Sequence, residues 1–190
     1  KLDLIAIPDF AMGAMENVGA VTFRENLLLF DKDKATRSEL DRSITVIAHE
    51  LAHMWFGDLV TMKWWDGIWL NEAFASLMEV IASYNTYPEF KQWNAMNMSR
   101  TAGFSIDSLE NSRPVEFDVE TPDQAEEMFD VLTYEKGSTV LRMFQMFIGE
   151  EAFQNGVEAY LNKFKFENTN SSDLWDALSE ASNQPLNKIL

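Results

Sequence analysis

The chain has 190 residues, 46% of them hydrophobic, which is enough for one well-packed core. Lysine and arginine total 15 against 31 acidic residues, and the net charge of −16 argues against a nucleic-acid backbone or an anionic membrane as the main partner. Its apolar runs are shorter than the roughly 18 residues that a membrane span needs. The absence of cysteine excludes disulfides and thiolate zinc sites within this sequence and favours a reducing, cytoplasmic compartment.

The first residues, KLDLIAIPDF, begin without an initiator methionine and lack the layout of a signal peptide. We therefore expect a fragment of a longer protein, with further domains in the parent. Residues 3–7 and 18–30 are rich in β-branched and apolar side chains and predict strands, with Gly13 and Gly19 breaking the stretch. Residues 1–35 are thus predicted to be the strand-rich part of a single domain.

The hydrophobic period changes to that of a helix at Thr36, which forms a capping-box pattern with Glu39. The pattern predicts a helix over 36–56 that ends at Gly57. Its apolar positions recur at helical spacing: Leu40, Ile44, Ile47, Leu51 and Trp55. The next stretch is expected to be irregular, and its tryptophans, Trp64, Trp65 and Trp69, to be core packing rather than a ligand cage.

The remaining sequence, to residue 190, predicts a helical lobe of the same domain. A long polar loop with glycine and proline is expected over 103–124. Around it the sequence predicts helices over 71–84, from Pro88 toward Arg100, 126–148 ending at Gly149, 150–165, and 172–182 behind a Ser171/Ser172 cap.

The two histidines of the chain lie four residues apart in HELAH, residues 49–53. On a helix, side chains at this spacing lie about 40° apart around the axis and roughly 6 Å along it, so His49 and His53 can reach one ion. Glu50 then lies beside the ion, where a carboxylate can take a proton from a metal-activated water. On this motif alone, ordinary residues of an amphipathic helix remain the alternative.

A third ligand is available at Glu72, which follows His53 after eighteen residues and lies at the start of the next predicted helix. Two histidines and a glutamate, with one open position, are an established ligand set for catalytic zinc. Glu79, two turns further along the same helix, and Ser76 are candidates for the residues that support the site, and neither is assigned that role from sequence.

The combination of HExxH, an eighteen-residue gap and Asn71-Glu72 resembles the gluzincin metallopeptidases. The stretch GAMEN, residues 13–17, is similar to the motif of the aminopeptidase N and puromycin-sensitive aminopeptidase group, and the flanks of these motifs and the stretch TYEKGSTVLRM agree as well. This resemblance covers nearly the whole chain. It implies an α+β, thermolysin-like catalytic domain that holds one Zn²⁺ and removes N-terminal residues from peptides.

The resemblance also implies a role for each matching position. His49, His53 and Glu72 would bind zinc, Glu50 would be the general base, and Tyr134 would donate a hydrogen bond to the oxyanion. The substrate-binding motif would be Gly13, Ala14, Met15, Glu16 and Asn17. In that motif Glu16 would hold the free α-ammonium of the peptide, and Met12 and Met15 would line the first substrate pocket. Without the resemblance, Glu16 would be a solvated turn residue and Tyr134 a packing residue.

Two alternative functions remain open. The same family includes an epoxide hydrolase that acts on a lipid, and a long apolar tunnel would favour that activity. A zinc-binding interaction module without catalysis is the second alternative, and the presence of both Glu50 and Tyr134 argues against it, because a structural zinc site needs neither.

Overall fold

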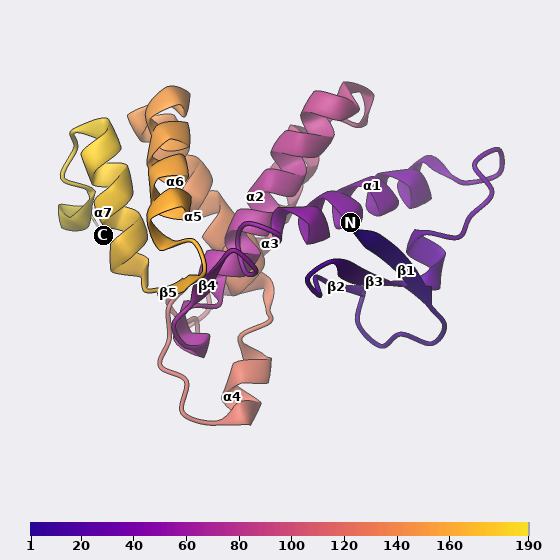
Figure 1. Cartoon of the computed structure of the whole chain (residues 1–190), viewed down its shortest axis with the longest axis horizontal. Coiled ribbons are helices and arrows are strands. Elements are labelled where there is room, and N and C mark those ends of the chain that lie inside the picture. The colour runs from indigo at the N-terminus through magenta and orange to yellow at the C-terminus, as the bar shows by residue number, and fades with distance from the viewer. Residues whose placement is uncertain (190) are drawn as a thin grey trace.

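The computed structural model describes residues 1–189 as a mixed α+β fold that is mostly helical. A small sheet lies on one side of α1 (Arg37–Ala52), and the other helices lie on its opposite side and beyond its end (Figure 1). The sheet has the order β1-β3-β2, with β3 parallel to β1 and antiparallel to β2. Its strands are β1 (Asp3–Ile7), β2 (Ala14–Met15) and β3 (Ala20–Arg24).

The strand predicted over 3–7 is confirmed, and the one predicted over 18–30 is too long. In β3 the side chains alternate, and Val21 and Phe23 are fully buried. After Arg24 the chain turns into a short 3-10 helix, which directs Leu27 into the small core between the sheet and α1. The apolar run after Arg24 therefore continues the core without continuing the strand.

The capping box predicted at the start of α1 is confirmed. The Thr36 backbone N–H donates to a Glu39 carboxylate oxygen at 2.8 Å, and the Glu39 N–H donates to the Thr36 hydroxyl at 3.2 Å. The predicted end of this helix is wrong, because α1 ends at Ala52 rather than near Phe56. The chain instead bends through a turn that closes with a bond from the Asp58 N–H to the His53 carbonyl.

The rest of the helical part follows the predicted order with changed boundaries. Its helices are α2 (Trp69–Thr86), α3 (Gln92–Asp107), α4 (Pro122–Glu127), α5 (Gly137–Ile148), α6 (Glu150–Phe164) and α7 (Ser171–Ser182). Pro88 starts a separate 3-10 turn and not the third helix. The loop predicted from residue 103 begins later, because α3 continues past the buried Gly103.

The helix predicted over 126–148 is wrong in its first half. A π-helical turn occupies Leu132–Lys136, and only α5 continues to the predicted end at Gly149. The cap predicted at Ser171/Ser172 is shifted by one residue to Asn170, whose N–H donates to the Asp173 carboxylate at 2.9 Å. A change of helix type or a cap shifted by one residue leaves little trace in hydrophobic periodicity, which explains these errors.

The irregular stretch after α1 contains β4 (Val60–Met62), which pairs in parallel with β5 (Glu167–Thr169). Neither strand is predicted by the sequence pattern, because the partners lie about a hundred residues apart. The pairing of β4 with β5 attaches the segment after α1 to the C-terminal helices. The turn between α1 and β4 is therefore held at one end by the helix and at the other by the strand pair.

The main core lies between α2, α5, α6 and α7. Phe74 is fully buried in it and stacks on Phe56, with ring centroids 4.3 Å apart and planes within 1° of parallel. Trp69 is buried as predicted, and its indole N–H donates to the Ser171 hydroxyl at 3.1 Å. The prediction that Trp64 and Trp65 are core residues is wrong, because they are 56% and 38% exposed.

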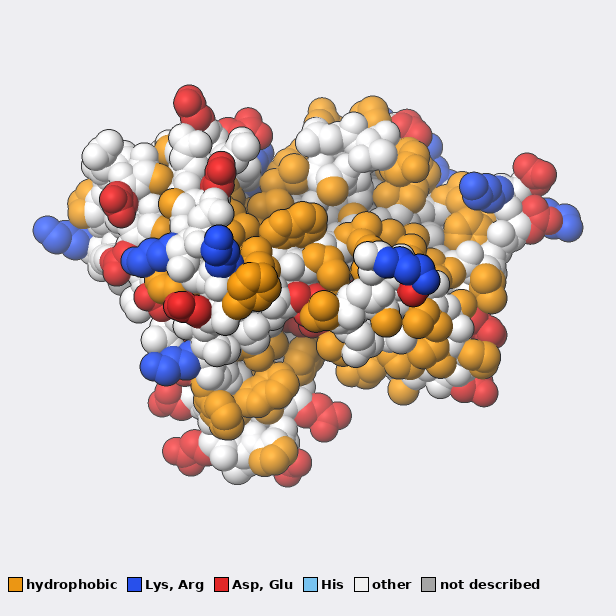
Figure 2. Space-filling model, in the orientation of Figure 1, with side chains coloured by type: hydrophobic (Ala, Val, Ile, Leu, Met, Phe, Trp, Pro, Cys, Tyr) orange, Lys and Arg blue, Asp and Glu red, His pale blue; other side chains and the backbone are white. Residues whose placement is uncertain are grey.

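Hydrophobic side chains are also spread over the surface, where they gather around the furrow between the sheet and the helices (Figure 2). Acidic side chains are visible at the bottom of this furrow in the same view. Among residues 1–189, no helix has the length and apolar character needed to cross a membrane.

We expect Phe74→Ala to destabilise the fold by about 3–5 kcal/mol, because the substitution leaves a cavity beside Phe56 at the centre of the core. Thermal unfolding followed by near-ultraviolet circular dichroism measures the change. Phe166→Ala is the control, since Phe166 is 85% exposed, and it should change stability by less than about 0.5 kcal/mol. Equal losses in the two variants would contradict the assignment of Phe74 to the core.

Candidate metal centre

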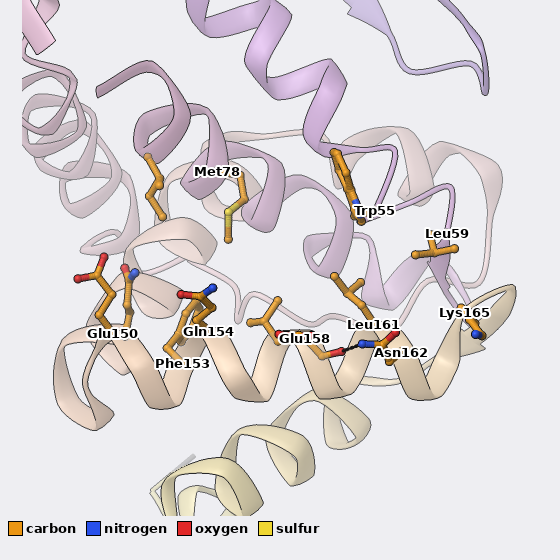
Figure 3. Close-up of a pocket in the computed structure, with 13 residues that line it drawn as sticks. Trp55, Leu59, Met78, Glu150, Phe153, Gln154, Glu158, Leu161, Asn162 and Lys165 are labelled. Carbon is orange, nitrogen blue, oxygen red and sulfur yellow. Dashed lines mark hydrogen bonds between the residues drawn. The ribbon is translucent and has the colours of Figure 1, made fainter. Parts of the chain in front are cut away.

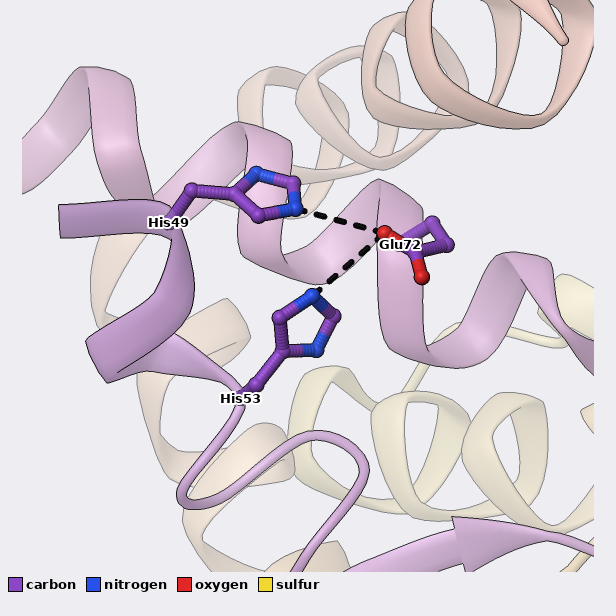
Figure 4. A group of neighbouring side chains, drawn as sticks. All are labelled: His49, His53 and Glu72. Atoms are coloured by element: carbon purple, nitrogen blue, oxygen red, sulfur yellow. Dashed lines mark hydrogen bonds and ion pairs between the residues drawn. The ribbon is translucent and has the colours of Figure 1, made fainter. Parts of the chain in front are cut away.

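The last turns of α1 and the first turn of α2 bring His49, His53 and Glu72 together (Figure 4). The Glu72 Oε2 atom lies 3.2 Å from His49 Nε2 and 3.4 Å from His53 Nε2. His53 and Glu72 are buried, and His49 is nearly so. The two histidines project from one face at the end of α1, as their spacing predicts, and their ring centroids are 4.8 Å apart.

The spacing of these donor atoms fits a tetrahedral ion. Two ligand atoms that each lie about 2.0–2.1 Å from a tetrahedral zinc are about 3.3 Å apart. The separations of 3.2 and 3.4 Å from Glu72 to the two histidines agree with that value. Imidazole nitrogens with one carboxylate oxygen are also a donor set that zinc accepts.

Glu50 lies beside this cluster with one oxygen unpaired. Its side chain is buried, and Oε2 has no hydrogen-bond partner among the described residues. A buried carboxylate oxygen without a partner is costly, and such oxygens are found where a ligand or a reacting group supplies the missing contact. Burial raises the pKa of Glu50 to about 7, against the lowering effect of His49 and His53, which suits a base that works near neutral pH.

The GAMEN segment approaches the cluster from the sheet. Ala14 and Met15 form β2, and the Gly13 carbonyl oxygen accepts a hydrogen bond from the Arg24 N–H at 2.9 Å. The Asn17 side-chain amide donates to Thr22 at 3.3 Å. These contacts fix the turn on β3.

The carboxylate of Glu16 projects from this turn toward the helices. Its carboxylate, that of Glu50 and a ring nitrogen of His53 lie within 4.8 Å of one another. Two carboxylates therefore meet beside the histidine pair, although 33 positions separate them in the sequence. Met12 and Met15, which the sequence predicts near the substrate, are 60% and 41% exposed.

The outer nitrogen of each histidine ring has an acceptor. His49 Nδ1 lies 2.8 Å from the Glu79 carboxylate, and His53 Nδ1 lies 2.8 Å from the Phe56 carbonyl oxygen. Such contacts fix the tautomer and the ring orientation of a metal-binding histidine. Glu79 was a candidate from its two-turn spacing to Glu72, whereas the Phe56 carbonyl is a backbone group that no sequence pattern marks.

The surrounding carboxylates favour positive charge at the cluster. Burial lowers the pKa of His49, but bonds with Glu72 and Glu79 outweigh it and raise that pKa to about 10. Burial also raises the pKa of Glu72, but the hydrogen bonds from both histidines outweigh it and lower the pKa to about 2. The carboxylates of Glu72 and Glu79, which raise the pKa of His49, would also attract a cation.

Tyr134 lies against the other side of His49, with the two rings stacked and their centroids 6.0 Å apart. It comes from the π-helical turn Leu132–Lys136, a type of turn often found at functional sites. Burial and the neighbouring Glu72 raise the pKa of its hydroxyl well above the ordinary value. The hydroxyl therefore stays protonated and is available as a hydrogen-bond donor.

The larger cavities of the helical part lie away from this cluster. One of about 430 Å³ is lined by side chains of α6, with Trp55, Leu59 and Met78 facing them (Figure 3). Its lining within residues 1–189 includes none of His49, His53 or Glu72. The cluster instead borders a smaller polar cavity of about 320 Å³, lined among others by His49, Glu79 and Tyr134.

Two histidines, a glutamate, a neighbouring buried carboxylate and an aligned tyrosine are typical of metal-dependent hydrolases. The chain belongs to peptidase family M1, whose domain model matches residues 1–190. The family resemblance read from the sequence motifs is thereby confirmed.

Several aminopeptidases are similar to the whole chain. Aminopeptidase M1-A of Oryza sativa subsp. japonica is 47% identical over 190 residues, which are 100% of this chain and 22% of the relative. The puromycin-sensitive aminopeptidase of Caenorhabditis elegans is 47% identical over 191 residues, 20% of its length. Aminopeptidase 2 of Candida albicans is 47% identical over 191 residues, 21% of its length. The chain thus spans about a fifth of these relatives.

We expect Gly57→Ala to weaken zinc binding about 10- to 100-fold, because the substitution disturbs the turn that presents the Phe56 carbonyl to His53. Gly57 has φ +135°, and a Cβ atom there would lie 3.4 Å from His53 Nδ1. Competition with a chromogenic chelator measures the affinity.

Gly149→Ala is the matched control for this variant. Gly149 also has a positive φ, +89°, but a Cβ atom there would have no neighbour within 4 Å, and it lies at the end of α5. It should lose stability through the same backbone strain and keep its zinc affinity. Equal zinc affinities in the two variants would show that the turn does not position His53.

Proposed function

We propose that the chain is the catalytic core of a zinc-dependent aminopeptidase with a thermolysin-like arrangement, in which His49, His53 and Glu72 hold the metal. One observation carries the proposal: Glu72 lies from each histidine nitrogen at the distance expected for two ligands of one tetrahedral ion, and Glu50, with one oxygen unpaired among the described residues, lies beside them. The printed names of the similar proteins, aminopeptidases in each case, support the same activity.

Bound zinc supplies a Lewis acid and lowers the pKa of a coordinated water. Glu50 lies where it can accept the proton of the attacking water and pass it to the leaving amine of the peptide. Its burial, which raises its pKa to about 7, favours both proton transfers near neutral pH. A glutamate with an ordinary pKa would accept the proton less readily.

Tyr134 is proposed to donate a hydrogen bond to the oxyanion that forms from the peptide carbonyl. Its ring is held against His49, and its hydroxyl is protonated. A donor placed before the reaction stabilises the developing charge more than water does, because it need not reorient.

Glu16 is proposed to bind the free α-ammonium of the substrate, close to Glu50 and His53. The backbone of Gly13, Ala14, Met15 and Asn17 would align the peptide. Because β2 is at the edge of the sheet, an extended peptide can pair with it as an added strand. A fixed negative charge beside Glu50 and His53 would select the first peptide bond of a chain.

We expect Glu50→Gln to lower kcat for alanyl- and leucyl-anilides by about 10²- to 10⁴-fold, because the variant keeps the shape of the side chain but cannot accept a proton. The assay uses the complete protein that carries this chain, with zinc content measured in parallel. Glu126→Gln is the control, since Glu126 is exposed on α4, and its kcat should not change.

Other outcomes of this assay would replace the proposal. Zinc binding without hydrolysis of any reporter would identify a catalytically silent binding module. Hydrolysis of a lipid epoxide by a protein that leaves the anilides intact would identify an epoxide hydrolase.

We expect Glu16→Gln to lower kcat/KM for free-amine reporters by about 10- to 100-fold, because a charged partner of the ammonium is lost. The wild-type protein should leave N-acetylated reporters almost uncleaved. Comparison of both reporter types in both proteins measures this discrimination. Cleavage of acetylated and free reporters at equal rates by the wild-type protein would remove Glu16 from the role of amine anchor.

A further inference from the structure

Gly137 lies one helical turn after Tyr134, where the π-helical turn passes into α5. It is buried against α2, at Ala73, the residue that follows Glu72. A Cβ atom built on Gly137 would lie 2.7 Å from the Ala73 Cβ atom. Ala73 is fully buried, and its Cβ is attached directly to the backbone, so it cannot rotate away. A larger side chain at Gly137 or at Ala73 would force α5 and α2 apart.

The beginning of the π-helical turn is fixed by a second set of contacts. One carboxylate oxygen of Asp130 accepts bonds from the backbone N–H groups of Leu132 at 2.9 Å and Thr133 at 3.1 Å. The same oxygen lies 2.5 Å from Arg113 Nη2, which also donates to the Thr133 hydroxyl at 3.0 Å. The turn that carries Tyr134 is therefore held at its start by a charged pair and at its end by the glycine contact.

We propose that Gly137 is a positioning residue for Tyr134: its contact with Ala73 sets how closely the tyrosine hydroxyl approaches the metal centre. Glu72 and Ala73 are adjacent on α2, so this contact lies one residue from a proposed metal ligand. Any displacement of the π-helical turn there moves Tyr134 relative to His49 and Glu72. The inference rests on the proposed function, and it assigns a role to a residue that contacts neither substrate nor metal.

The test is Gly137→Ala in the complete protein. Relief of a 2.7 Å contact requires a shift of about 1 Å, and a misplacement of that size lowers rate about 100-fold. We expect this loss in kcat, with KM and zinc content within about twofold of wild type, because Tyr134 acts on the transition state and the metal ligands do not move. Loss of zinc or a rise in KM alone would overturn the proposal.

Gly156→Ala is the matched control, because it creates a similar clash between helices away from the site. A Cβ atom there would lie 2.8 Å from Leu178 Cδ2 and 3.1 Å from Leu178 Cα, between α6 and α7. Its stability should fall and its kcat should remain unchanged. If both glycine variants lose kcat equally, the effect of Gly137→Ala is general destabilisation and the proposal is wrong.

Two double variants test whether Gly137 acts through space and through Tyr134. Gly137→Ala combined with Ala73→Gly removes the clashing methyl group, and the next atom, Val115 Cγ1, is 3.6 Å away, so kcat should recover at least tenfold. Gly137→Ala in a Tyr134→Phe background should cause little further loss, because the hydroxyl that it positions is gone. Full additivity with Tyr134→Phe would overturn the proposal.

Asp130→Asn keeps the proposal testable if Gly137→Ala does not fold, since it loosens the other end of the same turn. It should also lower kcat selectively and non-additively with Tyr134→Phe. The failure of the proposed function would be distinct from these outcomes. In that case the wild-type protein would have no aminopeptidase activity, whereas failure of the inference would leave an active enzyme that Gly137→Ala does not impair.

Discussion

The approach of Glu72 to His49 and His53 is the interaction on which the rest of the site depends. It places ionisable groups in a buried position, where each one alone would be unfavourable and together they are stabilised by mutual contacts. The approach is supported by packing beyond the site, where Phe56, in the turn after α1, stacks on the fully buried Phe74 of α2. The hydrophobic core thus supports an arrangement of charges that is unfavourable by itself.

The segments next to the cluster of His49, His53 and Glu72 determine its geometry as much as the three side chains do. The turn after α1 supplies the Phe56 carbonyl to His53, and pairing of β4 with β5 anchors that turn to the C-terminal part of the chain. Glu79 orients His49 from α2, the helix that also provides Glu72. A ring with both nitrogens engaged has one orientation, so little entropy is lost when a metal binds.

The sequence allowed prediction of those features that depend on local spacing. The HELAH motif, the capping box at Thr36 and the position of Glu72 near a helix start each involve residues within one or two turns, and the structure has them where expected. The features that escaped prediction depend on partners distant in sequence or on backbone groups. They include the β4 and β5 pair, the early end of α1, and the π-helical turn, which resembles an ordinary helix in its apolar pattern.

The tryptophan error shows the same limit for side chains. Residue type favours burial of all three tryptophans, yet only Trp69 lies in the core, while Trp64 and Trp65 are exposed and the Trp64 indole N–H donates to the Val119 carbonyl. Residue type gives a side chain its tendency to be buried, and tertiary contacts determine whether it is buried. The same reasoning applies within the site: Glu16, Glu50 and Glu72 are chemically alike, and only their neighbours differ. Glu16 follows an edge strand, Glu50 has a buried oxygen without a partner within residues 1–189, and Glu72 lies against two histidines. Under the proposed function, specificity for the peptide end and the chemistry of bond cleavage would therefore reside in chemically identical carboxylates.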